Sequence, residues 1–504
     1  MAKKDYWIIF SLLVFTFFIR FPALTRIAFL HDEIIVIQAA VRSLDFAVER
    51  GYWWEVLIDI PLRFSAAVTP LWNWLQYIVT LLLPVGEHPT RLLPFACSFL
   101  PIILSYYLTA QYFTRRIAIG TAIAFAISDI CLWTSTKSEF TEQLLVSCML
   151  SALIFMLRKN KRDFFIGSML LGIAPLTYLG KGIFIYALYL LWLTGGSFLK
   201  RYYWRHAKAN TFRDLVYYYG VLGISLIPTI VWLFAAFYRI GLIQSTNLKA
   251  ELGQIQSFSM YIYHLTVGIF KTRSFMQGYP GSNFIIYSYL EAWPTSTMMT
   301  PLALLGIISS LINLSKNNFS KSHELFLVMA VLGYVPFLYF TLNGYQGARY
   351  TLLYHYPFAL SFALGIQTLI TWFDLSLKNR IKGYLVIFII LCYAFLMIAR
   401  VSYVVLMFDW TLFWSLVLYG GGGFLISSSF IEYLFLSTKR MRLRYVSLFI
   451  FFMALTSITT YYFYCFGPNY WGKFQGWGVE ENNVKTFESR LFYDKYLTNS
   501  PVSK

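Results

Sequence analysis

Long runs of apolar residues recur along almost the whole chain, from Trp7 to Phe466. A helix needs roughly 20 mostly apolar residues to cross a bilayer, and many of these runs have that length. They lack the strict apolar and polar alternation of barrel strands, so they predict helices. Hydrophobic residues make up 58% of the chain and charged residues only 13%, a balance that excludes an ordinary soluble domain. An all-α polytopic membrane protein is therefore predicted.

The basic residues gather in short clusters between the apolar runs, which is a topology signal. Because cytoplasmic loops are rich in Lys and Arg, we expect all these clusters to lie inside, with a cytoplasmic N-terminus and an uncleaved first span. The clusters hold 22 of the 41 Lys and Arg, so the net charge of +18 reflects topology, and no nucleic-acid partner is expected. The clusters are 3–4, 115–116, 158–162, 200–213, 316–321, 378–382 and 439–444.

Alternation of the loops then predicts about thirteen spans in the cell membrane. They lie near 7–27, 91–113, 117–135, 142–157, 164–178, 181–199, 215–238, 296–315, 325–342, 351–372, 384–402, 411–436 and 446–466. The apolar stretch 70–85 cannot be a further span without inverting every later loop, so we expect it to be a half-buried or re-entrant outer segment.

The extracytoplasmic face is predicted to carry the functional part of the molecule. It receives the first outer loop 28–90, the loop 239–295 and a short tail 467–504, beside a transmembrane domain 1–466. Residues 44–64 mix tryptophan with acidic residues and indicate an amphipathic interfacial helix. The inner loops are short and contain no GxxxxGK[ST] phosphate loop, which excludes an ATP-driven transporter within this chain.

Two acidic clusters are predicted to meet on this outer face. His31-Asp32-Glu33 follows the first span, where a carboxylate can act as a general base or bind a cation. The alternative for this fragment is a solvated turn or a helix cap. The second cluster, Lys137 to Glu142 with Glu139 inside it, falls at the outer junction of two spans. Because both acidic clusters are predicted to lie at the same face, we expect an outward-facing polar site there.

Several cations at the same face are candidates for binding a lipid phosphate. A phosphate that leaves water needs one or two charge-assisted hydrogen bonds, although most surface Lys and Arg are simply solvated. Lys181 and Arg349 stand out because each adjoins the outer end of a span, and Arg91 and Lys137 are further candidates.

The order of these motifs resembles the C-type (GT-C) glycosyltransferases, in particular the branch of protein O-mannosyltransferases and lipid A aminoarabinose transferases, over most of residues 1–370. Thr69 departs from the family's pattern, in which many relatives have His or Lys before the proline. The second acidic cluster carries two glutamates where one acidic residue is usual. The motifs that carry the resemblance are Asp32-Glu33, Thr69-Pro70-Leu71, Arg91-Leu92-Leu93-Pro94, Lys137 with Glu142 at the spacing of an Arg-x4-Asp signature, 176–182 as a Leu-Thr-Lys-Gly segment, and Arg349-Tyr350.

The resemblance implies a GT-C fold and transfer of a sugar from a polyprenyl-phosphate carrier with inversion. Asp32 is then the general base, and Glu33, Glu139 or Glu142 orients the acceptor or stabilises the sugar. Lys137, Lys181, Arg349 and Arg91 are expected to neutralise the phosphate. No metal or other cofactor is required, although the oligosaccharyltransferase relatives leave room for a divalent cation at His31, Asp32 and Glu33. The short tail favours a monosaccharide donor.

The acceptor is expected to be a glycan, a lipid or a protein hydroxyl, with membrane lipids around the protein. A transporter or lipid-linked sugar flippase is the alternative function, because many spans and the glycines at 420–423 fit that class too. The clustering of polar residues at one outer face, rather than at the midplane, favours the enzyme. A noncatalytic assembly factor with the same fold is a third hypothesis.

Overall fold

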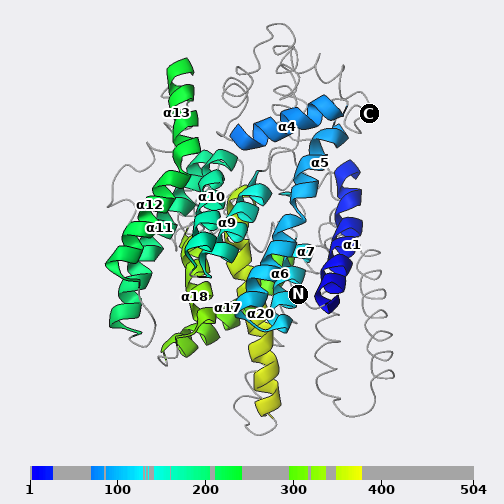
Figure 1. Ribbon diagram of the computed structural model, residues 1–504. Coiled ribbons are helices and arrows are strands. Elements are labelled where there is room, and N and C mark those ends of the chain that lie inside the picture. Colours follow the sequence, from blue (N-terminus) through cyan, green and yellow to red (C-terminus); the bar gives the residue numbers. More distant parts are fainter. Residues whose placement is uncertain are drawn as a thin grey trace, which may run out of the picture.

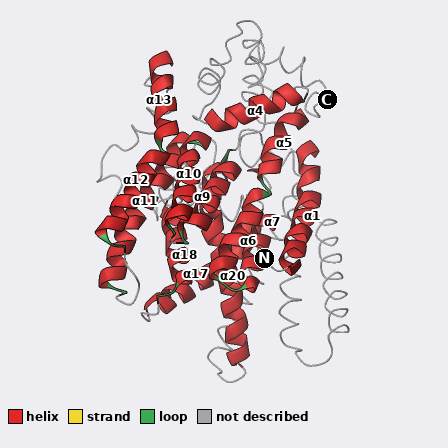
Figure 2. Cartoon of the chain, in the orientation of Figure 1, coloured by secondary structure: helices red, strands yellow, loops and turns green. Residues whose placement is uncertain are grey.

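The computed structural model describes residues 3–26, 70–83, 87–128, 131, 134–135, 141–158, 160–204, 210–240, 294–315, 319–335 and 348–376. Within these ranges the chain forms helices and no strand (Figure 2). Most of the helices run side by side in one bundle (Figure 1). The prediction of an all-α protein therefore holds for the described part of the chain.

The described helices follow the predicted spans closely. Each of the first ten predicted spans has a helix or a pair of helices at its place. The helices are α1 (Lys3–Arg26), α4 (Pro70–Leu82), α5 (Glu87–Cys97), α6 (Leu100–Tyr112), α7 (Arg115–Ile127), α9 (Glu142–Met156), α10 (Lys161–Thr177), α11 (Leu179–Tyr202), α12 (Phe212–Ser225), α13 (Ile227–Ile240), α17 (Pro294–Ser315), α18 (Lys321–Met329), the π-helix η2 (Ala330–Tyr334) and α20 (Ala348–Ser376).

Three helical stretches are long and apolar enough to cross a bilayer in the described part of the chain, judged by length and composition. They are Pro89–Tyr112, Leu179–Tyr202 and Phe212–Ala235. Several predicted segments lie outside the described residues. These are the last three predicted spans, the predicted interfacial helix 44–64, residues 241–293 of the predicted loop 239–295, and the tail 467–504.

Prolines account for two of the breaks between paired helices. Proline lacks a backbone N–H and disfavours a helical residue before it, so it is favoured in the first turn of a helix and often stands just after a break. Pro101 stands in the first turn of α6, directly after the break at Ser98 and Phe99. Pro228 stands in the first turn of α13, after the break at Leu226. Each pair therefore spans one predicted membrane segment as two helices.

Glycines allow neighbouring helices to pack closely, as small residues do in membrane bundles. A Cβ built on Gly306 of α17 would lie 1.8 Å from the Ser361 carbonyl oxygen of α20. A Cβ on Gly365 would lie 1.8 Å from the Leu302 carbonyl oxygen of the opposite helix. Helices α17 and α20 are thus in backbone contact, and only glycine fits at these two points.

Helix α4 lies across one end of the bundle, unlike the helices below it (Figure 1). It packs on α5 and α10. Its Trp72 and Gln76 are buried, whereas Leu81 and Leu82 are exposed. This placement agrees with the prediction that the stretch 70–85 is a half-buried segment rather than a further span. The end that α4 covers is therefore the predicted outer end.

Candidate functional site at the outer end

Glu142 and Lys181 form a buried ion pair at the end of the bundle that α4 covers, the predicted outer end. Lys181 Nζ donates to Glu142 Oε1, and both side chains are 1% exposed. Glu142 is the first residue of α9 and Lys181 is the third residue of α11. The sequence predicted each residue for the site separately, and the structure brings these two together.

The junction between α10 and α11 holds Lys181 in place. Helix α10 ends at Thr177, and Tyr178 is extended with φ of −155° before α11 begins. The ring of Tyr178 lies 4.3 Å from Lys181 Nζ, a distance at which a cation is attracted to the face of an aromatic ring. A Cβ on Gly182 would lie 2.4 Å from Pro175, so the backbone of α11 rests directly on α10. The Leu-Thr-Tyr-Leu-Gly-Lys-Gly segment is thus a rigid corner.

Hydrogen-bonding groups surround the ion pair at the start of α9. Gln143 Nε2 donates to Thr134 Oγ1 at 2.6 Å and to the Cys131 carbonyl at 3.1 Å. The second carboxylate oxygen, Glu142 Oε2, is buried and accepts no hydrogen bond from the described part of the chain, and neither does Gln143 Oε1. A buried acceptor without a donor is costly, so this arrangement suits a ligand or water that supplies N–H or O–H groups.

Arg91 is also buried at the predicted outer end, where it contacts α1. Its side chain is 0% exposed, and Nη1 donates to the Leu24 carbonyl oxygen at 2.9 Å. Leu24 stands in the last turn of α1, whose carbonyls have no partner within the helix. Arg91 therefore ties α5 to the end of α1, a few residues before Asp32. A contact of Arg91 with a phosphate stays a prediction.

Arg20 makes a second link between α1 and its neighbours, and the sequence analysis did not single it out. Its side chain is 0% exposed. Nη1 donates to the Ser98 carbonyl at 3.1 Å and Nη2 donates to the Phe125 carbonyl at 2.9 Å. Ser98 lies at the break after α5 and Phe125 in the last turn of α7, so a cation meets the negative ends of two helix dipoles. An arginine inside a predicted span was the signal available in the sequence.

The remaining predicted site residues fall outside the described ranges or at their edge. His31, Asp32, Glu33, Lys137 and Glu139 lie outside the described residues. Arg349 is the second residue of α20, and only its backbone is described. Among the described residues, no group of three or more His, Cys, Asp or Glu side chains is arranged to hold a metal ion.

Comparison with solved structures finds two matches with the same fold, both to one protein. The crystal structure of ArnT from Cupriavidus metallidurans in the apo state matches with a TM-score of 0.55 and 14% sequence identity, over 94% of this chain and 79% of that chain. The same ArnT bound to undecaprenyl phosphate matches with a TM-score of 0.54 and 14% identity, over the same shares of the two chains. The fold is therefore that of an ArnT-like GT-C protein.

The sequence itself matches one family model over about a third of the chain. Residues 67–234 match the family described as dolichyl-phosphate-mannose-protein mannosyltransferase, PMT_2. This range contains Arg91, Glu142 and Lys181. The resemblance inferred from the motifs is thereby confirmed: the chain is similar to the membrane glycosyltransferases of the PMT/ArnT type. No curated protein matches the full sequence at a significant level.

Proposed function

We propose that the protein transfers a monosaccharide from a polyprenyl-phosphate carrier to a hydroxyl group of a glycan, lipid or protein at the extracytoplasmic face. The buried Glu142–Lys181 pair carries this proposal, because it places a cation and a carboxylate together inside the segment that matches the mannosyltransferase family. The relative of the same fold that binds undecaprenyl phosphate supports a lipid phosphate as the donor's leaving group.

The reaction is a substitution at the anomeric carbon. The acceptor oxygen attacks that carbon, its bond to the phosphate oxygen breaks, and the polyprenyl phosphate departs with the electron pair. Asp32 takes the proton of the acceptor hydroxyl as general base, and attack from the face opposite the phosphate inverts the configuration. Glu33 and Glu139 are assigned to orienting the acceptor. A phosphate is a good enough leaving group for this step to need no metal.

Lys181 is the residue that we assign to the leaving phosphate. An ammonium group is a compact positive charge with three N–H donors, and the bond to Glu142 holds that charge in position. Glu142 Oε2 is left to accept a hydrogen bond from a sugar or acceptor hydroxyl. Lys137, Arg349 and Arg91 are assigned to the same phosphate. The pair thus pre-organises a positive charge where negative charge develops.

Donor binding by charge-matched variants tests the assignment of the ion pair. Lys181→Met leaves the buried charge of Glu142 without its cation, which destabilises the fold. The double variant Lys181→Met with Glu142→Gln is therefore included, because it removes both charges. We expect both to bind polyprenyl-phosphate sugar at least tenfold more weakly than the parent protein, measured by competition with labelled donor in detergent. Lys200→Met with Glu324→Gln, at the other end of α11, is the matched control. Donor affinity unchanged in the outer double variant would contradict the assignment.

Turnover by Asp32→Asn tests the general base separately. Removing a general base costs about 10²-fold or more in rate, whereas the isosteric amide should leave donor affinity close to that of the parent protein. Purified protein is incubated with labelled donor and acceptor, and product is counted after extraction. Near-normal turnover would remove Asp32 from this role. A protein that only moves the donor between leaflets, without releasing polyprenyl phosphate, would establish the flippase alternative instead.

A further inference from the structure

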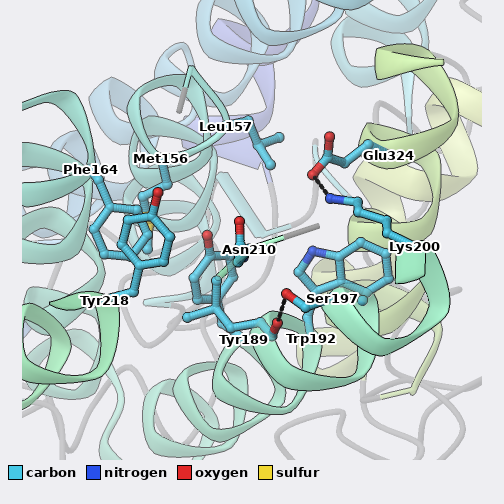
Figure 3. A pocket seen from close by; sticks show the side chains of 12 residues that line it. Met156, Leu157, Phe164, Tyr189, Trp192, Ser197, Lys200, Asn210, Tyr218 and Glu324 are labelled. Carbon is cyan, nitrogen blue, oxygen red and sulfur yellow. Dashed lines mark hydrogen bonds and ion pairs between the residues drawn. The ribbon is translucent and has the colours of Figure 1, made fainter. Parts of the chain in front are cut away.

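A second buried ion pair lines a cavity at the opposite end of α11. Lys200 Nζ donates to Glu324 Oε1 at the start of α18, and their side chains are 6% and 10% exposed. The cavity has a volume of about 30 Å³, which is room for roughly two water-sized groups. It lies between α9, α10, α11, α12 and α18 (Figure 3). The Glu142–Lys181 site is at the other membrane face, so this cavity is separate from it.

Polar side chains that line this cavity point to a ligand. Tyr189 is 2% exposed and lines the cavity. Tyr218, Asn210 and Trp192 also line the cavity. Phenol, amide and indole groups around an ion pair match a ligand that carries hydroxyl groups.

The surroundings of the cavity carry an excess of positive charge. The acidic residues there are already engaged: Asp163 pairs with Arg158 at 3.6 Å, Asp214 caps α12, and Glu324 holds Lys200. The exposed cations around the same end are Lys161, Arg162, Arg201, Arg213 and Lys321. This surplus attracts an anionic group such as a phosphodiester.

Exposed aromatic side chains place the cavity at the level of lipid headgroups. Phe198, Tyr202, Tyr203 and Phe212 are 61%, 60%, 56% and 81% exposed, and all four stand at the ends of α11 and α12 next to the cavity. Aromatic residues gather at the boundary between lipid and water in membrane proteins. A ligand of this cavity therefore comes from the lipid side.

We propose that this cavity binds the hydroxylated headgroup of an anionic glycerophospholipid in the leaflet opposite the Glu142–Lys181 site. The cavity has space for the terminal diol of a glycerol headgroup, with Tyr189, Tyr218 and Asn210 as hydrogen-bond partners. The phosphodiester stays at the rim among the exposed cations, and the acyl chains lie along the exposed apolar faces of α11 and α12. The proposal does not depend on the glycosyl transfer reaction.

Native mass spectrometry of the full-length protein with defined lipids tests the proposal. Phosphatidylglycerol carries both the negative charge and the diol, phosphatidylserine carries the charge alone, and phosphatidylcholine carries neither. We expect phosphatidylglycerol to be retained three- to tenfold better than either. Tyr189→Phe and Asn210→Leu each remove one hydrogen-bonding group and should abolish most of this preference. The loss of one hydrogen bond is enough to account for a three- to tenfold change in retention.

Matched controls separate the cavity from its surroundings. Tyr219→Phe removes a hydroxyl from α12 that does not line the cavity, and it should keep the preference. Equal retention of the three lipids, or a preference that survives in Tyr189→Phe and Asn210→Leu, would overturn the proposal and leave only a cationic surface. Glycerol phosphate that competes as well as the lipid would show a soluble ligand instead. Displacement by undecaprenyl phosphate would show a second donor site, which also overturns it.

Discussion

At the scale of single residues, two buried arginines, Arg20 and Arg91, donate to backbone carbonyls at helix ends or breaks. Arg20 illustrates the physics, because a guanidinium far from water needs acceptors that no apolar neighbour provides. It finds them in the carbonyls of Ser98 and Phe125, which are freed by a helix break and a helix end. The charge is thus compensated, and α1 is held against α5 and α7.

Replacement of Arg20 should destabilise the protein without touching the ion pair at the outer end. Arg20→Met leaves two buried carbonyls without a donor, which destabilises the protein, but it also removes a buried charge, which offsets part of the loss. We expect the free energy of unfolding to fall by about 2 kcal/mol. The measurement is the thermal unfolding midpoint of purified protein in detergent. Arg201→Met, an exposed cation in the last turn of α11, should unfold at the parent midpoint. Equal midpoints for both variants would contradict the role assigned to Arg20.

At the scale of helices, the packing of α17 on α20 depends on two glycines that face carbonyl oxygens. Gly365→Ala brings a Cβ to 1.8 Å from the Leu302 oxygen, so the two helices must move apart along their whole contact. Overpacking of this kind typically costs about 1–3 kcal/mol, and we expect the upper part of that range here because backbone atoms cannot rotate away. Denaturant or thermal unfolding in detergent measures it.

Gly220→Ala is the matched control for that substitution. A Cβ on Gly220 of α12 meets no atom within 4 Å, and alanine is the better helix former. This variant should therefore be as stable as the parent protein or slightly more so. A destabilisation as large as that of Gly365→Ala would mean that the loss reflects glycine replacement in general and not the crossing of α17 and α20.

The sequence predicted where the described helices lie because the length and polarity of an apolar run are local properties. It also placed Glu142 and Lys181 at one face from loop charges alone, and it set α4 apart from the spans. It did not predict that Glu142 and Lys181 pair, or that Lys200 meets Glu324, since these contacts depend on how α9, α11 and α18 pack. The predictions for Asp32 and Glu139 lie outside the described residues.

At the scale of the whole molecule, α11 carries one buried ion pair near each of its ends. Lys181 and Lys200 are separated by about 28 Å along the helix at a rise of 1.5 Å per residue, close to the thickness of the bilayer core. The cavity at the Lys200 end is lined by residues next to three predicted cytoplasmic clusters, 158–162, 200–213 and 316–321. The structure thus gathers at one end the loops that the positive-inside rule assigns to one side.

Labelling of single cysteines tests which end faces the cytoplasm. In a background without the five native cysteines, Lys321→Cys should react with a membrane-impermeant maleimide only after the cells are opened. Leu83→Cys, at the end of α4 and 39% exposed, should react in intact cells. We expect this result because loops rich in Lys and Arg stay on the cytoplasmic side of membrane proteins, and Lys321 belongs to such a loop. Labelling of both positions from one side would contradict the thirteen-span topology. If Leu83→Cys reacts only in opened cells and Lys321→Cys reacts in intact cells, the Glu142–Lys181 site faces the cytoplasm. That result would contradict the proposed reaction at the extracytoplasmic face.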